Sequence, residues 1–589
     1  MLSGLSAAVR RLSAAAVILL APIAPLSAAE VASLGTWSGP NGSSVLPRLL
    51  SPADTDLYGR ILNAQADGRF AEADKLIKQL KDALLLGHVL AERYLAPGYR
   101  ATYPELAAWL KHYGDHPGAD EIYKQALKRK PRGANPPRPS VAAEAVLAAP
   151  ANDDVYDAVA RDRRARALQT QMFGAIQGGN PETAERLLDR DETRQFFDPV
   201  EYDNARARVA AGYLYKGNTK KARKLAAAAA ARSRDRLSQA DWIGGLAAWR
   251  DGDWAAARAS FESLARSRVA SSWMVSAGAY WASRAAIRNG EPEAVIPLLE
   301  QAGRHPRSFY GLLALRELGE EPDFAWELPP LDGAAAARLL SMRGTQRAMA
   351  LAELGRHDLA EREVLVLQRA AGGGMAAPLL GLVSRLDMAH LQMRLGGGAR
   401  NAAGKRYDST VYPLPAWSPP GGFTIDRALL FALMRQESAF NTKATSRAGA
   451  RGLMQLMPRT ASFVAQDKSL HGNNRAKLYA PDLNVSLGQQ YVAHLIDGTP
   501  AGDNLFFLAA AYNGGPGNLQ RWLNTIDHEN DPLLFIETIP NRETRGFIER
   551  VLSNYWIYRH RLGQDLGSLD QLASGEWPRY RPEDADIPR

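Results

Sequence analysis

The chain of 589 residues contains no cysteine. Disulfide bonds, thiolate metal sites and a lipid-modified N-terminal cysteine are therefore excluded. The apolar run near the N-terminus, residues 12–24, contains Pro22 and is too short to span a bilayer comfortably. No intense basic patch marks residues 421–562, which hold 15 Lys and Arg against 12 Asp and Glu. Solubility explains a charge excess of this size, and no nucleic-acid-binding motif accompanies it.

The N-terminus has the pattern of a secretory signal. Arg10 and Arg11 precede the apolar run, and the small residues Ser27-Ala28-Ala29 follow it. We expect cleavage after Ala28 or Ala29, so that the mature protein has no stable membrane insertion. An uncleaved N-terminal anchor is the alternative.

Residues 51–395 read as successive helices, rich in Ala, Leu and Arg, with almost no strand-like alternation. Helix pairs are separated by a glycine next to polar residues, at Gly68, Gly179, Gly217, Gly252, Gly290 and Gly355. A spacing of 35 to 38 residues between Gly179, Gly217, Gly252 and Gly290 is typical of an α-solenoid of tetratricopeptide-like hairpins. Each glycine is predicted to be a left-handed helix C-cap. The solenoid offers a concave surface for a polymer or protein, or serves as a scaffold.

The sequence predicts an all-α protein with several domains. Two stretches rich in Pro, Ala or Gly mark connections, and the polar end of the chain is expected to be loosely held. The predicted organisation is a signal peptide (1–29), an N-terminal helical segment (30–130), a Pro/Ala-rich connection (131–150), an α-superhelical domain (151–395), a linker (396–422), a compact α-rich domain (423–563) and a tail (564–589).

Glu437 is the most informative residue of the compact domain. It continues a helical apolar stripe made by Leu429, Leu430, Leu433 and Met434. Burial and the negative end of the helix dipole both raise the pKa of a carboxyl group, which suits it for general-acid chemistry. Thr424 is the expected N-cap of this helix, with Asp426 in its first turn. A buried glutamate with a structural partner is the alternative interpretation.

Further motifs follow Glu437 in a fixed order. They are Glu437-Ser438, Gly452-Leu453-Met454-Gln455, Ala511-Tyr512-Asn513, and Ile539-Pro540 with Glu543-Thr544-Arg545. With these motifs the chain resembles the soluble lytic transglycosylases of Gram-negative bacteria. The resemblance implies a lysozyme-like catalytic domain preceded by helical domains, which close into a ring in that family. It also implies a periplasmic location.

The resemblance implies cleavage of the β-1,4 bond between N-acetylmuramic acid and N-acetylglucosamine in peptidoglycan. The muramic C6 hydroxyl attacks its own anomeric carbon and leaves a 1,6-anhydro product. One carboxylate then suffices, and Glu437 acts first as acid and then as base. Asp426, eleven residues earlier on the same helix, lies about 16 Å away and is too far to pair with it. Glu543 is expected to have a supporting structural role.

Five residues of the motifs are candidates for substrate contact: Ser438, Met454, Gln455, Tyr512 and Asn513. The amides of Gln455 and Asn513 suit acetamido or hydroxyl groups, with loop bracing as the alternative. Met454 packs on a sugar face or in the core, and Ser438 orients substrate or caps a backbone carbonyl. The hydroxyl of Tyr512 is expected to reach Glu437 or the departing oxygen.

Gly449 and Gly452 are expected to keep the wall of the substrate groove thin. Phe547 stands where the family commonly has tyrosine, so a hydroxyl role there is in doubt. Tyr555, two helical turns later, is predicted to present a hydroxyl on the same face and is a sixth candidate for substrate contact.

Two rival functions stay open: a hydrolytic muramidase on the same fold, and a non-catalytic peptidoglycan-binding envelope scaffold. No cofactor or metal is expected for the reaction, because His471, His494 and His528 are scattered in the last domain. The expected partners are peptidoglycan glycan strands, and cell-wall synthases or other envelope proteins through the helical domain. Nucleic acid is not an expected partner.

Overall fold

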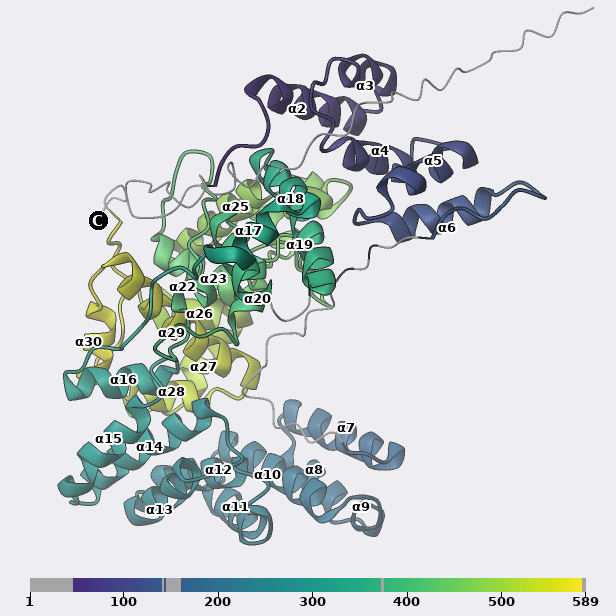
Figure 1. Cartoon of the computed structure of the whole chain (residues 1–589). Helices are drawn as coiled ribbons and strands as arrows, with labels where there is room; N and C mark the ends of the chain where they lie inside the picture. Colours follow the sequence, from purple (N-terminus) through teal and green to yellow (C-terminus); the bar gives the residue numbers. More distant parts are fainter. Residues whose placement is uncertain (1–45, 140–141, 143, 145–159, 372–374, 585–589) are drawn as a thin grey trace, which may run out of the picture. The chain divides into compact units, whose positions relative to one another are not determined.

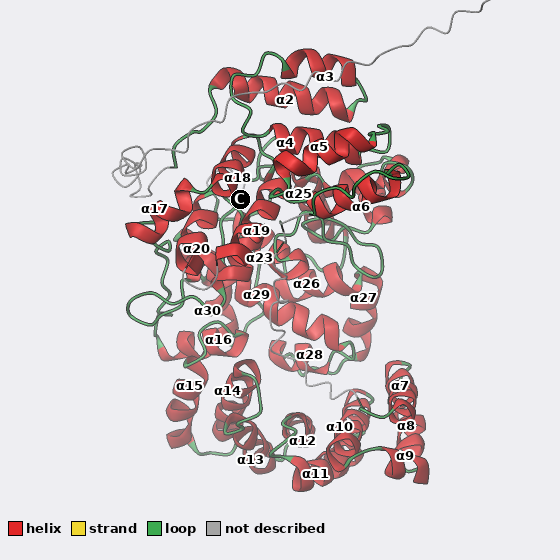
Figure 2. Cartoon of the chain, turned by 45° about the vertical axis from the view of Figure 1, so that its right-hand side comes forward, coloured by secondary structure: helices red, strands yellow, loops and turns green. Residues whose placement is uncertain are grey.

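The computed structural model describes residues 46–139, 142, 144, 160–371 and 375–584. The predicted signal peptide and part of the connection 131–150 lie outside these residues. The prediction of an all-α fold is confirmed, because the described residues form helices and isolated β-bridges but no β-strand (Figure 2). Within the same residues, no helix combines the length and apolarity that a membrane crossing requires.

The chain divides into two compact units, each made of two separate stretches. Unit 1 comprises residues 1–147 and 328–399, and unit 2 comprises residues 148–327 and 400–589. The helices of unit 1 are α2 (Pro52–Ala66), α3 (Phe70–Ile77), α4 (Leu86–Leu95), α5 (Tyr103–Tyr113), α6 (Ala119–Arg129), α17 (Gly333–Ser341), α18 (Arg343–Glu353), α19 (His357–Ala371), α20 (Ala376–Arg385) and α21 (Ala389–Gly396) (Figure 1).

Unit 1 has one main core shared by both of its stretches. Tyr58 and Val89 of the first stretch belong to the same buried cluster as Met349 and Leu382 of the second. Outside the apolar core, the backbone N–H of Leu49 donates to the carboxylate of Glu353, 304 residues away in the sequence. Residues 328–399 therefore fold onto the N-terminal helices.

Unit 2 begins with a row of paired helices (Figure 1). They are α7 (Arg163–Gln177), α8 (Pro181–Leu188), α9 (Asp191–Phe196), α10 (Pro199–Tyr215), α11 (Thr219–Ser233), α12 (Gln239–Arg250), α13 (Trp254–Ala265), α14 (Ser272–Arg288), η2 (Pro292–Ala294), α15 (Val295–Gly303) and α16 (Phe309–Leu318). From α10 to α16 each α-helix packs against the next. This is the stacking expected of a solenoid.

The punctuating glycines end helices as predicted. All six, Gly68, Gly179, Gly217, Gly252, Gly290 and Gly355, have φ between +69° and +81°. After α12 the N–H of Asp253 donates to the carbonyl of Ala248 at 3.0 Å, which closes the turn around Gly252. The side chain of Asp253 then accepts the N–H of Ala256 and caps α13. A Gly-polar pair thus ends one helix and begins the next.

The rest of unit 2 is built of α22 (Asp408–Val411), α23 (Arg427–Ser438), α24 (Pro458–Val464), η4 (Lys468–His471), η5 (Arg475–Tyr479), α25 (Pro481–Gly498), α26 (Leu505–Gly514), α27 (Pro516–Thr525), α28 (Pro532–Thr538), α29 (Arg542–Leu562) and α30 (Gly567–Ala573). The long helix α29 packs against α23, which carries Glu437, and against α26. It therefore holds the two helices of the candidate site together.

Polar contacts join the solenoid to this last part of unit 2. Tyr310 in α16 donates to Glu537 in α28 at 2.5 Å, and Trp273 in α14 donates to Glu549 in α29 at 2.7 Å. Arg307 forms a double ion pair with the buried Asp408, at 2.6 Å for each contact. Asp408 belongs to the stretch predicted as a linker, and this part of it is packed against the solenoid.

The polar segment after Gly563 is not loosely held, in contrast to the prediction. It forms α30, and the hydroxyl of Tyr580 accepts the N–H of Asp426 at 2.9 Å. Asp584 forms an ion pair with Arg427 at 3.0 Å. Apolar contacts also hold the segment, since Leu569 and Leu572 are buried and the ring of Trp577 packs against Phe506, Phe507 and Phe535. The polar average composition of the segment concealed these few apolar anchors.

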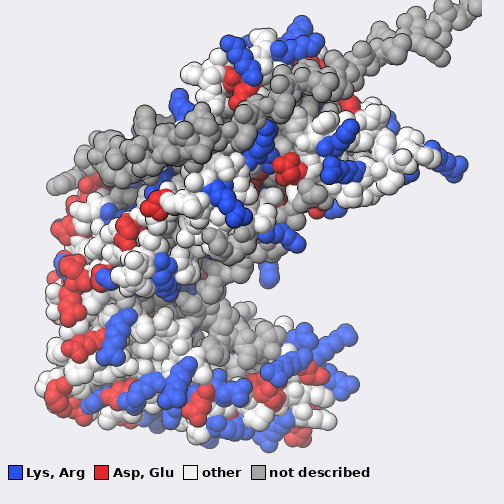
Figure 3. All heavy atoms as spheres, viewed as in Figure 1, with Lys and Arg blue, Asp and Glu red and all other residues white. Residues whose placement is uncertain are grey.

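Basic and acidic side chains alternate on the solenoid surface, where Figure 3 shows them side by side. Arg223 pairs with Asp251 and Asp253 of the following hairpin, and Arg258 pairs with Glu291 in the same manner. Such exposed pairs contribute little to stability singly, about 0–1 kcal/mol each. Arg223 and Arg258 therefore link one hairpin to the next.

Candidate active site

Glu437 lies in the last turn of α23, whose apolar stripe is buried as the sequence pattern predicts. The N-cap is Asp426 and not Thr424. The carboxylate of Asp426 accepts the N–H groups of Glu583 and Asp584 and a guanidinium N–H of Arg559, each at 2.9 Å. Asp426 is fully buried, and its carboxylate therefore holds residues 583 and 584 in place.

The carboxyl group of Glu437 is poised to hold a proton near neutral pH. Glu437 remains partly exposed, but the protein around it removes enough water to raise its pKa to about 8. The negative charge of Glu543 is the second cause of this raised pKa. A neutral carboxyl at pH 7 can donate a proton to an ether oxygen.

The chain turns sharply directly after Glu437. Ala439 and Phe440 both have left-handed backbone conformations, with φ of 47° and 62°. The hydroxyl of Ser438 donates to the carbonyl of Met434 at 3.1 Å. Ser438 thus caps a backbone carbonyl, which was the second of its two predicted roles.

A glycine-containing loop follows this turn and is held by close packing. At Gly452, with φ of +75°, an added Cβ atom would lie 2.3 Å from the Leu478 carbonyl oxygen and 2.5 Å from Asn484 Nδ2. Gly449 has φ of +93° and open space around it. Gly452 therefore has a packing reason for being glycine, whereas Gly449 has a conformational one.

Met454 and Gln455 are both engaged by the protein. Met454 is fully buried and its sulfur packs against Gly488, so the structure places it in the core. The amide nitrogen of Gln455 donates to the carbonyls of Ala444 and Gly452 at 3.2 and 2.8 Å. Of the two interpretations of Gln455, loop bracing is the one that these contacts support.

Tyr512 joins the loop to Glu437. Its hydroxyl donates to the Met454 carbonyl at 2.8 Å, and the charge of Glu437 contributes to raising its pKa well above its usual value, although burial is the larger cause. The ring of Phe547 lies nearly parallel to it, with centroids 6.2 Å apart. The structure thus brings Glu437, Tyr512 and the Gly452–Gln455 loop together.

Asn513 and Glu543 come from neighbouring helices. The side-chain oxygen of Asn513 accepts the hydroxyl of Thr544 at 2.7 Å, which ties α26 to the first turn of α29. Glu543 lies in that same first turn and is exposed. Its effect on Glu437 is electrostatic, and no hydrogen bond joins the two among the contacts of the described residues.

The predicted substrate contact for Tyr555 does not fit the structure. Its ring is fully buried, with the Arg559 guanidinium 4.8 Å from the ring centroid. Its hydroxyl lies near Asp426 and Tyr580, at the opposite end of α23 from Glu437. Two turns of α29 move a side chain about 11 Å along the helix, and this shift carries Tyr555 past the site.

Sequence reasoning missed two residues of α25. Asn484 is fully buried, accepts the N–H of Met454 at 2.8 Å and donates to the carbonyls of Arg451 and Leu478. Tyr491 lies 5.5 Å from Tyr512 between ring centroids. Their spacing of two helical turns places both on one face of α25, and this was the available signal.

Comparison with known proteins matches the same region. Residues 421–535 match the family described as "Transglycosylase SLT domain". The soluble lytic murein transglycosylases of Salmonella typhimurium and Escherichia coli are 36% and 37% identical to this chain over 159 residues. The match covers 27% of this chain and 24% of either relative, so the chain spans about a quarter of the length of these relatives.

Two solved structures share the fold over most of the chain. The 70-kDa soluble lytic transglycosylase of Escherichia coli aligns with a TM-score of 0.51 and 19% identity, covering 90% of this chain and 99% of that one. An inactive Glu-to-Gln variant of the lytic transglycosylase Slt of Pseudomonas aeruginosa aligns with a TM-score of 0.53 and 21% identity, covering 90% and 84%. The motifs and the matched domain agree: residues 421–535 are similar to the transglycosylase SLT domain, and the helical fold of the chain is shared with these solved structures.

Proposed function

We propose that this protein is a lytic transglycosylase that cleaves the β-1,4 bond between N-acetylmuramic acid and N-acetylglucosamine of peptidoglycan. The observation that carries the proposal is the carboxyl group of Glu437, whose pKa is raised to about 8 at the end of a buried helix. At pH 7 this carboxyl is largely protonated, as the first step of the reaction requires.

In the first step Glu437 donates its proton to the glycosidic oxygen while the bond from that oxygen to the anomeric carbon breaks. In the second step the muramic C6 hydroxyl oxygen bonds to the anomeric carbon, and its proton returns to Glu437. No water is consumed, the product carries a 1,6-anhydro ring, and the enzyme is restored. A single carboxyl group with a pKa near the working pH serves both steps.

The residues around Glu437 have positioning roles in this proposal. Tyr512 and Asn484 hold the Gly452–Gln455 loop through the Met454 backbone. We propose that the loop presents Gln455 to the sugar, and that Ser438 and Asn513 line the same site. Direct contacts from these three side chains stay a prediction, since each also has a bracing bond within the protein.

The relatives support the assignment. The relatives from Salmonella typhimurium and Escherichia coli are named soluble lytic murein transglycosylases, and the inactive Pseudomonas aeruginosa variant carries a Glu-to-Gln change. The 70-kDa soluble lytic transglycosylase has also been solved in complex with bulgecin A. By this likeness we propose peptidoglycan strands as the substrate and the periplasm as the location, reached through the predicted signal peptide.

A hydrolytic muramidase is the second candidate, and one observation favours it. Glu543 is a second carboxylate whose charge acts on Glu437. Glycosidases that use water commonly employ two carboxyl groups, one as acid and one as base or nucleophile. In that mechanism Glu543 would activate water and the product would carry a reducing end.

Mass spectrometry of digested sacculi tests both candidates. The proposal expects anhydromuramoyl products; products heavier by one water would replace it with hydrolysis. Glu437→Gln should lower turnover by at least about 10³-fold with glycan binding retained, because it removes the acid and keeps the shape. Glu543→Gln is the matched control and should keep the anhydro product.

A scaffold without catalysis is the remaining alternative. It predicts that Glu437→Gln leaves glycan release unchanged, because the last domain would bind the glycan strand without cleaving it. Partners of the helical domain, such as cell-wall synthases, are a separate proposal, and pull-down with the Glu437→Gln protein on intact sacculi tests it without digestion of the wall.

A further inference from the structure

Three side chains that can ligate a metal converge inside unit 1. They are His88 in α4, His116 in the turn between α5 and α6, and Glu363 in α19. One ligand atom of each lies within 4.8 Å of the others, and the three residues are between 0% and 4% exposed. His88 and Glu363 are 275 residues apart in the sequence, so the cluster joins the two stretches of unit 1.

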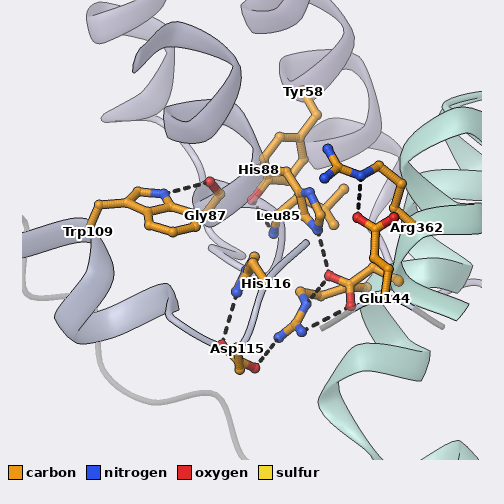
Figure 4. Close-up of polar contacts among 11 residues, drawn as sticks. Tyr58, Leu85, Gly87, His88, Trp109, Asp115, His116, Glu144 and Arg362 are labelled. Carbon is orange, nitrogen blue, oxygen red and sulfur yellow. Dashed lines mark hydrogen bonds and ion pairs between the residues drawn. The ribbon is translucent and has the colours of Figure 1, made fainter. Parts of the chain in front are cut away.

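The tautomer of His116 is fixed by its neighbour Asp115. Its Nδ1 lies 3.0 Å from the Asp115 carboxylate, which can only accept, so Nδ1 carries the proton (Figure 4). The other nitrogen, Nε2, therefore has a bare lone pair. Nε2 is buried and has no hydrogen-bond partner among the residues that the structure describes. A carboxylate behind the far nitrogen is the usual support of a metal-binding histidine.

The second histidine and the carboxylate are already in contact. Nε2 of His88 lies 2.7 Å from Oε1 of Glu363. Arg347 donates to both oxygens of Glu363, at 2.5 and 3.1 Å, and to Asp115 at 3.0 Å. The guanidinium fixes the orientation of the carboxylate, while each carboxylate oxygen has further lone-pair directions.

The net charge of the cluster is negative, which favours binding of a cation. With both histidines neutral, the two carboxylates outweigh the single guanidinium by one negative charge. Arg347 opposes a second cation, so affinity depends on direct bonds to nitrogen and oxygen more than on long-range attraction. Such bonds are what imidazole and carboxylate offer to zinc.

The backbone beside the cluster is shaped for His116. A Cβ atom at Gly87 would lie 2.4 Å from His116 Nε2, so only glycine leaves this nitrogen its space. The indole N–H of Trp109 donates to the Gly87 carbonyl at 2.9 Å and holds α4 in place (Figure 4). The absence of a side chain at Gly87 is therefore what lets His116 occupy its position.

We propose that His88, His116 and Glu363 form a binding site for one divalent transition-metal ion, with Zn²⁺ as the preferred ion. His116 would bind through Nε2. The ion would take the place of the proton between His88 and Glu363, and that proton would move to Nδ1 of His88. Water would complete the tetrahedron. Because the three residues are buried, the site serves the stability of unit 1 and is independent of the proposed transglycosylase reaction.

The untagged full-length protein, stripped with EDTA and dialysed, is titrated with ZnCl₂ by calorimetry. We expect binding of one equivalent and a higher melting temperature. His116→Phe keeps the ring and removes the lone pair, and should lower the affinity at least about a hundredfold. Asp115→Asn should lower it about tenfold through the orientation of His116. His112→Ala is the matched control, since His112 is an exposed histidine of the same hairpin, and its affinity should equal that of wild type.

X-ray absorption of the Zn²⁺-loaded wild type keeps the test independent of variant folding. Two imidazole ligands and a short oxygen shell are expected. An all-oxygen shell, no zinc bound to the folded wild type, or equal affinity of a folded His116→Phe protein would each overturn the proposal. The cluster would then be a buried ion-pair network without a metal.

Discussion

The negative charge of Glu543, in the first turn of α29, contributes to the raised pKa of Glu437 at the end of α23. The two helices pack directly against each other, so the electrostatic relation is fixed by the core of the last domain. Burial of Glu437 is the larger cause, and the like charge adds to it. This relation gives the site a pH dependence that can be tested.

Glu543→Gln should shift the alkaline limb of the pH–activity profile to lower pH. Without the negative charge of Glu543, the ionised form of Glu437 is less destabilised, so the pKa of Glu437 falls from about 8 toward 4.5. The protonated form that donates to the substrate is therefore lost at a lower pH. The expected shift is a fraction of a pH unit, because burial remains. The initial rate of glycan release between pH 5 and about 10 measures it. Asp497→Asn removes an exposed charge elsewhere in the domain and should leave the limb in place; a limb unmoved in both variants would refute the electrostatic relation.

Glu437→Gln should make the protein more stable at neutral and alkaline pH. The folded pKa of about 8 exceeds the ordinary glutamate pKa of 4.5, so the folded state keeps a proton that the unfolded state releases. Stability is therefore lost as pH rises from 4.5 through 8, and the glutamine variant escapes this loss. Allowing for the partial exposure of Glu437, we expect a gain of about 1–3 kcal/mol at pH 8.

Chemical denaturation of wild type and Glu437→Gln at several pH values measures this gain. Below pH 4.5 the two proteins should have equal free energies of unfolding, since both states then hold the proton. An equal difference at all pH values would mean that the glutamine acts through packing and not through the titration of Glu437.

Gly452→Ala should be much more damaging than Gly449→Ala. Both positions have positive φ, which costs about 1–2 kcal/mol for alanine. Only at Gly452 does the added Cβ meet a backbone carbonyl, at 2.3 Å, so overpacking adds about 1–3 kcal/mol and moves the loop that carries Gln455. Unfolding free energy and glycan release report the two effects, and equal losses in both variants would contradict the packing argument.

Local patterns predicted much of this fold. The Gly252-Asp253 pair correctly predicted the end of one helix and the start of the next. Helix caps are made by residues close to the helix end, so they can be recognised from local sequence. The apolar stripe before Glu437 likewise indicated one buried helix face. Both signals arise from contacts within a few residues, where sequence and geometry are directly linked.

Long-range contacts could not be read in the same way. The return of residues 328–399 to the N-terminal helices and the use of Asp426 by Glu583 and Asp584 depend on partners far away in the chain. Helical periodicity says which face is buried but not against which element. Tyr555 is an example. The sequence predicted the face of α29 on which it lies, but its position two turns along the helix places it in the core beside Arg559 and away from the candidate site.

A last prediction concerns two buried carboxyl groups between the solenoid and the last domain. Glu537 accepts the hydroxyl of Tyr310, and Glu549 accepts the indole N–H of Trp273. Burial raises the pKa of both, that of Glu549 well above its usual range, so Glu549 holds a proton. Because both folded pKa values are raised, stability is lost as pH rises. Glu549→Gln imitates the protonated acid and should flatten this loss, with equal or greater stability at pH 7.

Tyr310→Phe is the contrasting variant for this pair. It removes the donor to buried Glu537 and keeps the ring, so it should cost about 1–3 kcal/mol. Unfolding free energies measured from pH 5 to about 9 distinguish the two changes. Glu549→Gln should alter the slope against pH, whereas Tyr310→Phe should mainly lower the stability itself. A Glu549→Gln protein that is less stable than wild type at pH 7 and keeps the same slope would mean that Glu549 is ionised, with Glu537 or another group carrying the proton.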